Sequence, residues 1–81
     1  MTVHELIDRL QKAQIHFTMS SSRVGESVAM FHCSVPGQRW EIEVFPDGHV
    51  EVELFLSSND GVWDDNARLI ALIDEWSEPQ P

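Results

Sequence analysis

Two runs of alternating polar and apolar residues on either side of a tight turn constrain the fold of this chain more than any other feature of its sequence. The turn is Pro46-Asp47-Gly48, in which proline fixes φ and glycine is free to adopt a positive φ. Polar and apolar residues alternate along Arg39–Phe45 and again along His49–Leu56. A period of two is typical of strands, so the two runs predict a hairpin with one apolar and one polar face.

The length of the turn sets the register of this hairpin. A three-residue loop with a left-handed glycine pairs Phe45 with His49. The apolar cross-strand pairs are then Val44–Val50, Ile42–Val52 and Trp40–Leu54. The polar pairs are Glu43–Glu51 and Glu41–Glu53, so like charges are expected to lie directly opposite each other.

A second turn signal, Pro36-Gly37, tests this register independently. It follows a strand expected over Ser27–Val35, and a four-residue loop closed by Ser34 and Arg39 gives the same pairs as a two-residue loop. These pairs are Cys33–Trp40, Phe31–Ile42, Ala29–Val44, His32–Glu41 and Met30–Glu43. Both turns agree on which face is apolar, and a slip of one residue would exchange the faces.

Helices are expected at both ends of the chain. Thr2 and Glu5 form a capping box, and apolar residues recur at helical spacing over Val3–Gln14. A second helix is expected over Trp63–Trp76, with Asp64 and Asp65 near its positive end. Its predicted apolar stripe consists of Trp63, Ala67, Ile70, Ile73 and Trp76, widened by Leu69 and Leu72.

The remaining segments complete the predicted fold. Ile15–Ser20 alternates as a first strand, Ser20–Gly25 and Ser57–Gly61 are expected to be loops, and 77–81 is expected to be a frayed tail. Short connections favour an antiparallel meander. We therefore predict one domain, residues 1–81, of the α+β class: a four-stranded antiparallel meander with N- and C-terminal helices packed on one face. The expected buried strand residues are Phe17, Met19, Ala29, Phe31, Cys33, Trp40, Ile42, Val44, Val50, Val52 and Leu54.

The other face of the sheet gathers the candidate partner-binding residues. We call the four glutamates Glu41, Glu43, Glu51 and Glu53 the acidic face. The flanking candidates are Phe45, Phe55, His32 and Met30. Opposed like charges cost about 0.2–1 kcal/mol per pair, and the fold does not require them. The competing interpretation is that the carboxylates only keep the protein soluble.

The charge of the chain is concentrated in its second half. The 81 residues contain 14 Asp and Glu against 5 Lys and Arg, which gives a formal net charge of −9. Residues 1–40 hold three acids and four bases, whereas residues 41–81 hold eleven acids and one base. This balance argues against direct binding to nucleic acid or to an anionic membrane. A localised negative field instead favours a basic protein partner.

Other chemistry finds little support in the sequence. The single cysteine, Cys33, excludes an internal disulfide and suits a reducing cytoplasm. There is no signal peptide pattern and no apolar run of about 20 residues. Cys33 is expected to be buried without a basic neighbour, and no nucleophile elbow or phosphate loop occurs, so we predict no enzyme and no cofactor. A metal-binding regulator built on His32, Glu41 and Glu53 is an alternative, although its spacing matches no metal motif.

Arg39–Glu53, together with the Glu5-Leu6-Ile7 helix leading into Ile15-His16-Phe17, resembles many short acidic bacterial proteins. Some of these are similar to immunity proteins, which neutralise polymorphic or contact-dependent toxins. The resemblance implies a cytoplasmic inhibitor that docks on a cationic toxin, often a nuclease, and blocks its active site. Immunity proteins share no single motif, so no residue role carries over.

The sequence therefore predicts a cytoplasmic, non-enzymatic module that binds a basic protein. One alternative is a small structural subunit that forms a homodimer or larger homo-oligomer through the uncovered face or an edge strand. In that case the negative charge would serve only solubility.

Overall fold

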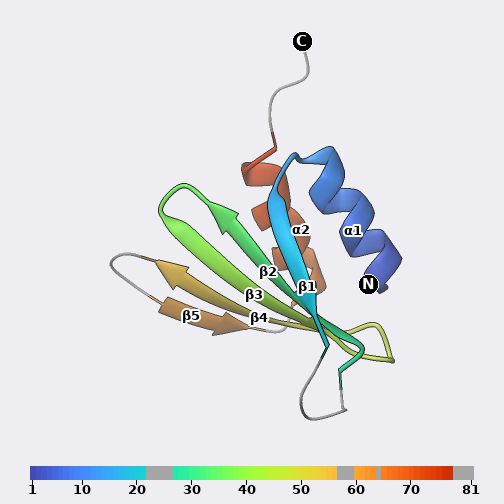
Figure 1. Ribbon diagram of the computed structural model, residues 1–81. Coiled ribbons are helices and arrows are strands. Elements are labelled where there is room, and N and C mark those ends of the chain that lie inside the picture. Colours follow the sequence, from blue (N-terminus) through green and yellow to red (C-terminus); the bar gives the residue numbers. More distant parts are fainter. Residues whose placement is uncertain (22–26, 57–59, 64, 78–81) are drawn as a thin grey trace.

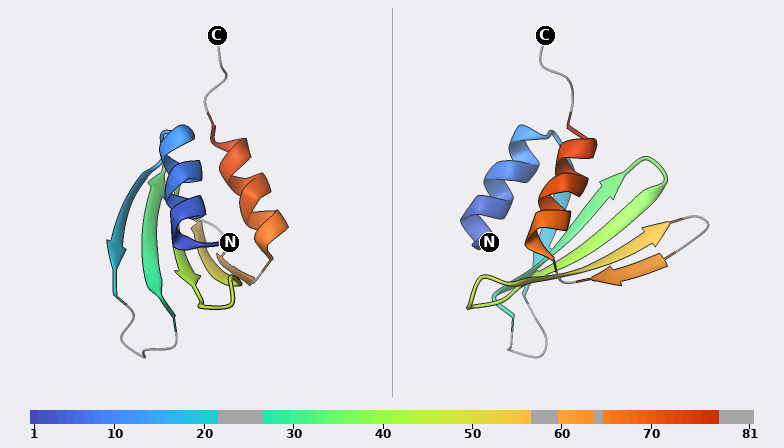
Figure 2. Two further views of the ribbon diagram at one scale, coloured as in Figure 1. Left: turned by 90° about the vertical axis from the view of Figure 1, so that its right-hand side faces the viewer. Right: turned by 180° about the vertical axis from the view of Figure 1, so that it is seen from behind.

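The computed structural model describes residues 1–21, 27–56, 60–63 and 65–77, and it has two helices on one face of an antiparallel sheet (Figures 1 and 2). The elements follow the chain as α1 (Val3–Lys12), β1 (His16–Ser20), β2 (Ala29–Val35), β3 (Gln38–Val44), β4 (Val50–Leu56), β5 (Asp60–Trp63) and α2 (Asn66–Glu75). The strands lie in sequence order, so the sheet is a meander. The predicted α+β class and the placement of the helices are confirmed.

The predicted register is confirmed at both hairpins. Glu43 lies opposite Glu51, and Glu41 lies opposite Glu53. On β2, His32 lies opposite Glu41 and Met30 opposite Glu43. The glutamates therefore share one face of the central strands, as the alternation requires.

Both turns have the geometry that their glycines allow. Gly48 has φ +90°, and its N–H donates to the Phe45 carbonyl at 2.9 Å, while the Phe45 N–H donates to the His49 carbonyl at 3.0 Å. Gly37 has φ +77° in a two-residue turn that Val35 and Gln38 close. Since L side chains rarely adopt a positive φ, glycine at these two positions fixes the turn types and with them the register.

The Thr2 half of the predicted capping box of α1 is confirmed. Thr2 Oγ1 accepts a hydrogen bond from the Glu5 N–H at 3.1 Å. The helix ends at Lys12, two residues before the predicted Gln14, because Gln14 adopts a left-handed conformation with φ 59°. Asp8 and Lys12 form an exposed ion pair at 2.9 Å.

In the C-terminal part of the chain, the structure differs from the prediction in two respects. Asp60 and Gly61, expected in a loop, and Trp63, expected in a helix, belong to β5, which pairs with β4. Trp63 lies opposite Val52. Its side chain therefore packs against the core from the edge strand β5 and not from a helix. The helix begins at Asn66, capped by Asp65, whose carboxylate accepts from the Ala67 and Arg68 N–H groups.

The apolar stripe of α2 is rotated relative to the prediction. Ala67 is exposed, whereas Leu69 and Ile73 are fully buried and Leu72 and Trp76 pack against the core. These four residues follow the i, i+3, i+4, i+7 spacing of a helix that packs one side on a sheet. Trp63 does not belong to this stripe because it lies in β5.

The core lies between the helices and the sheet. Its fully buried large side chains are Trp40, Phe31, Leu6, Leu10, Ile42, Leu69, Ile73, Val44, Val50, Val52 and Cys33. Three predicted core residues differ: Phe17 and Leu54 are only half-buried, and Met19 is 45% exposed. Met19 lies on β1, which is an edge strand of the sheet.

A few predictions fall outside the described residues. They concern the loop over 22–25, the segment 57–59, Asp64 and the tail over 78–81. In the part of the chain that is described, neither helix has the length and hydropathy needed to cross a membrane.

Candidate functional site

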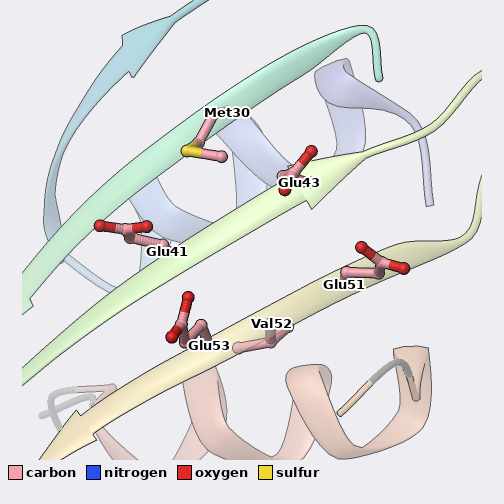
Figure 3. Close-up of a pocket in the computed structure, with 6 residues that line it drawn as sticks. All are labelled: Met30, Glu41, Glu43, Glu51, Val52 and Glu53. Atoms are coloured by element: carbon pink, nitrogen blue, oxygen red, sulfur yellow. The ribbon is translucent and has the colours of Figure 1, made fainter. Parts of the chain in front are cut away.

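The acidic face is built by two neighbouring strands, each of which contributes two glutamates. Figure 3 shows these four side chains with Met30 of β2 beside Glu41 and Glu43. The cross-strand pairs on this face form two rows, Met30–Glu43–Glu51 and His32–Glu41–Glu53. Because directly opposite side chains have Cβ atoms about 4.5–5.5 Å apart, the four carboxylates form one compact group.

The acidic face surrounds a shallow depression. It has a volume of about 70 Å³ and is lined by Met30, Val52 and the four glutamates. Small-molecule sites usually enclose about 300–1,000 Å³. The depression is therefore too small to enclose a ligand of that size.

The glutamates differ in exposure. Glu41 and Glu43 on the central strand β3 are half-buried, whereas Glu51 and Glu53 on β4 are exposed. Among the residues that the structure describes, Glu43, Glu51 and Glu53 have no basic group within 4.0 Å. Their carboxylates therefore form no ion pair with a described residue.

His32 lies at the border of the acidic face. Its Nδ1 is 4.0 Å from Glu41 Oε1, and its Nε2 is 3.1 Å from the Ser20 hydroxyl, so either ring nitrogen can carry the proton. The order serine, histidine, carboxylate is also that of a hydrolase triad. However, 4.0 Å is too long for the carboxylate hydrogen bond that orients the imidazole in such a triad.

Phe45 and Phe55 flank the acidic face at opposite ends, as predicted, and each stacks on its own neighbour. The Phe45 ring is parallel to the His49 ring with centroids 4.2 Å apart. The Arg39 guanidinium lies 4.3 Å from the centroid of the Phe55 ring, its cross-strand partner. Arg39 thus places a positive charge at one end of the acidic face, a contact that the sequence analysis missed although Arg39 and Phe55 follow from the same register.

The turn between β3 and β4 carries a further carboxylate. Asp47 accepts hydrogen bonds from the His49 backbone N–H at 3.0 Å and from the His49 ring at 2.5 Å. The backbone hydrogen bond, followed by the contact with the ring, lowers the pKa of Asp47 below its ordinary value. The turn brings His49 onto both Asp47 and Phe45.

The helix side of the sheet offers different chemistry. A hollow of about 310 Å³ lies between α2 and the strands, lined by Gln38, Leu54, Trp63, Arg68, Ala71, Leu72 and Glu75. The Arg68 guanidinium stacks 4.5 Å from the Trp63 ring centroid. Since the charged groups here are of opposite sign, this hollow lacks the single-sign field of the acidic face.

The remaining candidates are structural or do not form a ligand set. Cys33 is fully buried, and this burial raises the pKa of its thiol to about 12. No group of three or more potential metal-ligating side chains occurs in the described ranges, so His32, Glu41 and Glu53 do not converge on a metal.

The fold and the site define a small α+β meander with an acidic sheet face that neither α1 nor α2 covers. Comparison of the chain with protein-family models, with curated proteins and with solved structures finds no match. The resemblance to immunity proteins stays a prediction.

Proposed function

We propose that this protein is a non-enzymatic binding module that docks its acidic face on a basic protein. The observation that supports the proposal is the convergence of four carboxylates on a sheet face that no helix covers, three of them without a basic neighbour among the described residues. Such a group steers a positively charged partner and raises its association rate.

The surroundings of the acidic face suit a protein interface. Protein interfaces combine apolar anchors with a charged or polar rim. Met30 lies within the group of carboxylates, and the half-buried rings of Phe45 and Phe55 lie at its two ends. In this proposal the carboxylates attract and orient the basic partner. The apolar side chains are buried against the partner, which removes their surface from water.

The most specific form of this proposal is an immunity-type inhibitor. A toxin nuclease needs a cationic surface to hold phosphate groups. A compact set of carboxylates matches that surface, so the acidic face would occupy the nucleic-acid site and block it. The protein itself carries out no reaction in this proposal and needs no cofactor.

The test is capture of the partner from the source cell with variant baits. Glu41→Lys combined with Glu53→Lys reverses two opposed charges on the acidic face. Asp74→Lys combined with Glu75→Lys makes the same change in net charge at exposed positions near the end of α2. We expect the wild type and the helix variant to capture the same basic protein, and the acidic-face variant to lose it while keeping its circular dichroism spectrum.

Salt separates this proposal from its alternatives. Binding by the acidic face should weaken strongly above physiological ionic strength, where the Debye length falls below about 8 Å. Capture that is insensitive to salt and equal for both variants would refute docking by the acidic face. It would favour the structural or homo-oligomerising subunit instead.

A further inference from the structure

The two edges of the sheet are protected to different degrees. Edge strands are normally blunted by charged residues, proline or short length, because their free N–H and C=O groups can pair with another chain. β5 has four residues and begins with Asp60. β1 has five residues, His-Phe-Thr-Met-Ser, with neither proline nor a lysine, arginine or acidic residue. In the described part of the chain only β2 pairs with it.

We propose that β1 pairs antiparallel with β1 of a second copy of this chain, which joins the two sheets into one. The strand is self-complementary in this arrangement. A two-fold axis at Thr18 places Thr18 opposite its own copy, Phe17 opposite Met19, and His16 opposite Ser20. All five residues of the strand then take part in pairing. This proposal does not rest on the function proposed above.

The exposed apolar side chains on the helix face of β1 support this register. Met19 is 45% exposed, and Phe17 is half-buried with its ring 5.6 Å from the ring of Phe31. The two-fold axis brings Phe17 of each copy against Met19 of the other, so the interface contains two equivalent sulfur–aromatic pairs. The exposed surface of Met19 is thereby covered without any change in the fold.

The charges around β1 also permit self-association. Residues 1–40 are almost neutral, whereas a dimer through β5 would bring together two copies of the strongly acidic second half. On α1, Glu5 and Asp8 precede Arg9 and Lys12, and all four are exposed. The two-fold axis runs the two α1 helices antiparallel, and each copy brings both acidic and basic α1 side chains to the dimer rather than charges of one sign.

The dimer has a consequence for the acidic face. An antiparallel pair of edge strands requires a two-fold axis perpendicular to the sheet. Both acidic faces then point to the same side, and all four helices lie on the other side. Such a dimer presents two equivalent binding surfaces, which raises the avidity for a partner with two matching sites.

Sedimentation equilibrium of the full chain over a wide range of concentrations tests the dimer. We expect a concentration-dependent mass that rises from 9.3 kDa towards twice that value. Met19→Lys introduces two charges into the interface and should weaken dimerisation at least tenfold. Val28→Lys is the matched control, because Val28 is 55% exposed but lies outside β1. It should leave dimerisation unchanged.

A cysteine variant tests the register itself. Thr18→Cys places two thiols directly opposite each other at the axis, within the Cα separation of about 4.4–6.8 Å that a disulfide spans. Oxidation should convert this variant to a covalent dimer, whereas Val28→Cys should stay monomeric on a non-reducing gel. Cys33 does not interfere because it is buried. A wild-type mass of 9.3 kDa at every concentration, or equal effects of the Met19 and Val28 variants, would overturn the proposal.

Discussion

The two faces of the central strands come from alternate residues of the same segments, yet they are built in opposite ways. The helix face carries Trp40, Ile42 and Val52, all of which are fully buried. The open face carries Glu41 and Glu53 directly opposite each other. Packing explains every residue of the first face, whereas nothing in the packing calls for the like-charged pairs of the second. This difference is why the open face is the better candidate for function.

Removing one aromatic ring from each face should give the largest difference in the free energy of unfolding. Phe31→Ala empties part of the core and should lower the free energy of unfolding by about 3–5 kcal/mol. Phe55→Ala on the open face removes a half-buried ring and its contact with Arg39, and should cost about 1 kcal/mol. Urea denaturation of both variants measures the difference. Equal losses would show that the two faces do not differ in packing.

Thiol labelling should separate the faces at neighbouring positions. Cys33 points into the core, whereas Ser34 is exposed. Because burial raises the pKa of Cys33 to about 12 from its ordinary value of 9.0, its thiolate fraction at neutral pH is roughly a thousandfold lower. We expect Ser34→Cys to add one rapidly labelled thiol while Cys33 stays unreactive until the protein unfolds. Rapid labelling of Cys33 in the native protein would contradict its placement.

Removing charge repulsion on the open face should make the protein more stable. Glu41→Gln combined with Glu53→Gln removes one opposed pair and should raise the free energy of unfolding by about 0.2–1 kcal/mol at low ionic strength. High salt should reduce the gain because it already screens the repulsion. Glu5→Gln is the control, since Glu5 lies in the first turn of α1, where a negative charge is favourable. A loss of stability in the double variant would mean that these glutamates stabilise the fold.

The smallest expected effect concerns pH at the β3–β4 turn. The pKa of Asp47 is lowered in the folded protein, chiefly by the hydrogen bond from the His49 backbone N–H. Its carboxylate therefore contributes stability above its ordinary pKa of 3.8, and that contribution is lost as the pH falls through the lower folded value. Asp47→Asn should be less stable than the wild type near neutral pH, and the difference should shrink in acid. A pH-independent difference would rule out this linkage.

Much of the fold follows from the sequence because two glycine turns fix the register of three strands. Once Gly48 and Gly37 determine the turn lengths, alternation places every residue of β2, β3 and β4 on a face. The acidic face could therefore be predicted residue by residue. β5 could not, because its four residues are too short a pattern to distinguish from the start of a helix.

The contact between Ser20 and His32 was also beyond sequence reasoning. The hydrogen bond between Ser20 and His32 joins residues that are diagonal neighbours on adjacent strands, and no spacing in the chain indicates it. The exposure of Met19 depends on how far the helices extend over the edge of the sheet. Alternation predicts the face of the sheet on which a side chain lies, but it does not predict whether a helix covers that side chain.

Carboxyl footprinting of the complex with the captured basic partner tests the central claim most directly. Carbodiimide labelling followed by mass spectrometry reports the accessibility of each acidic side chain with and without the partner. We predict that binding protects Glu41, Glu43, Glu51 and Glu53, while Asp8 and Asp74 on the helices stay labelled. Full labelling of the four glutamates in the complex, with protection on the helices, would contradict the assignment of the acidic face as the docking surface.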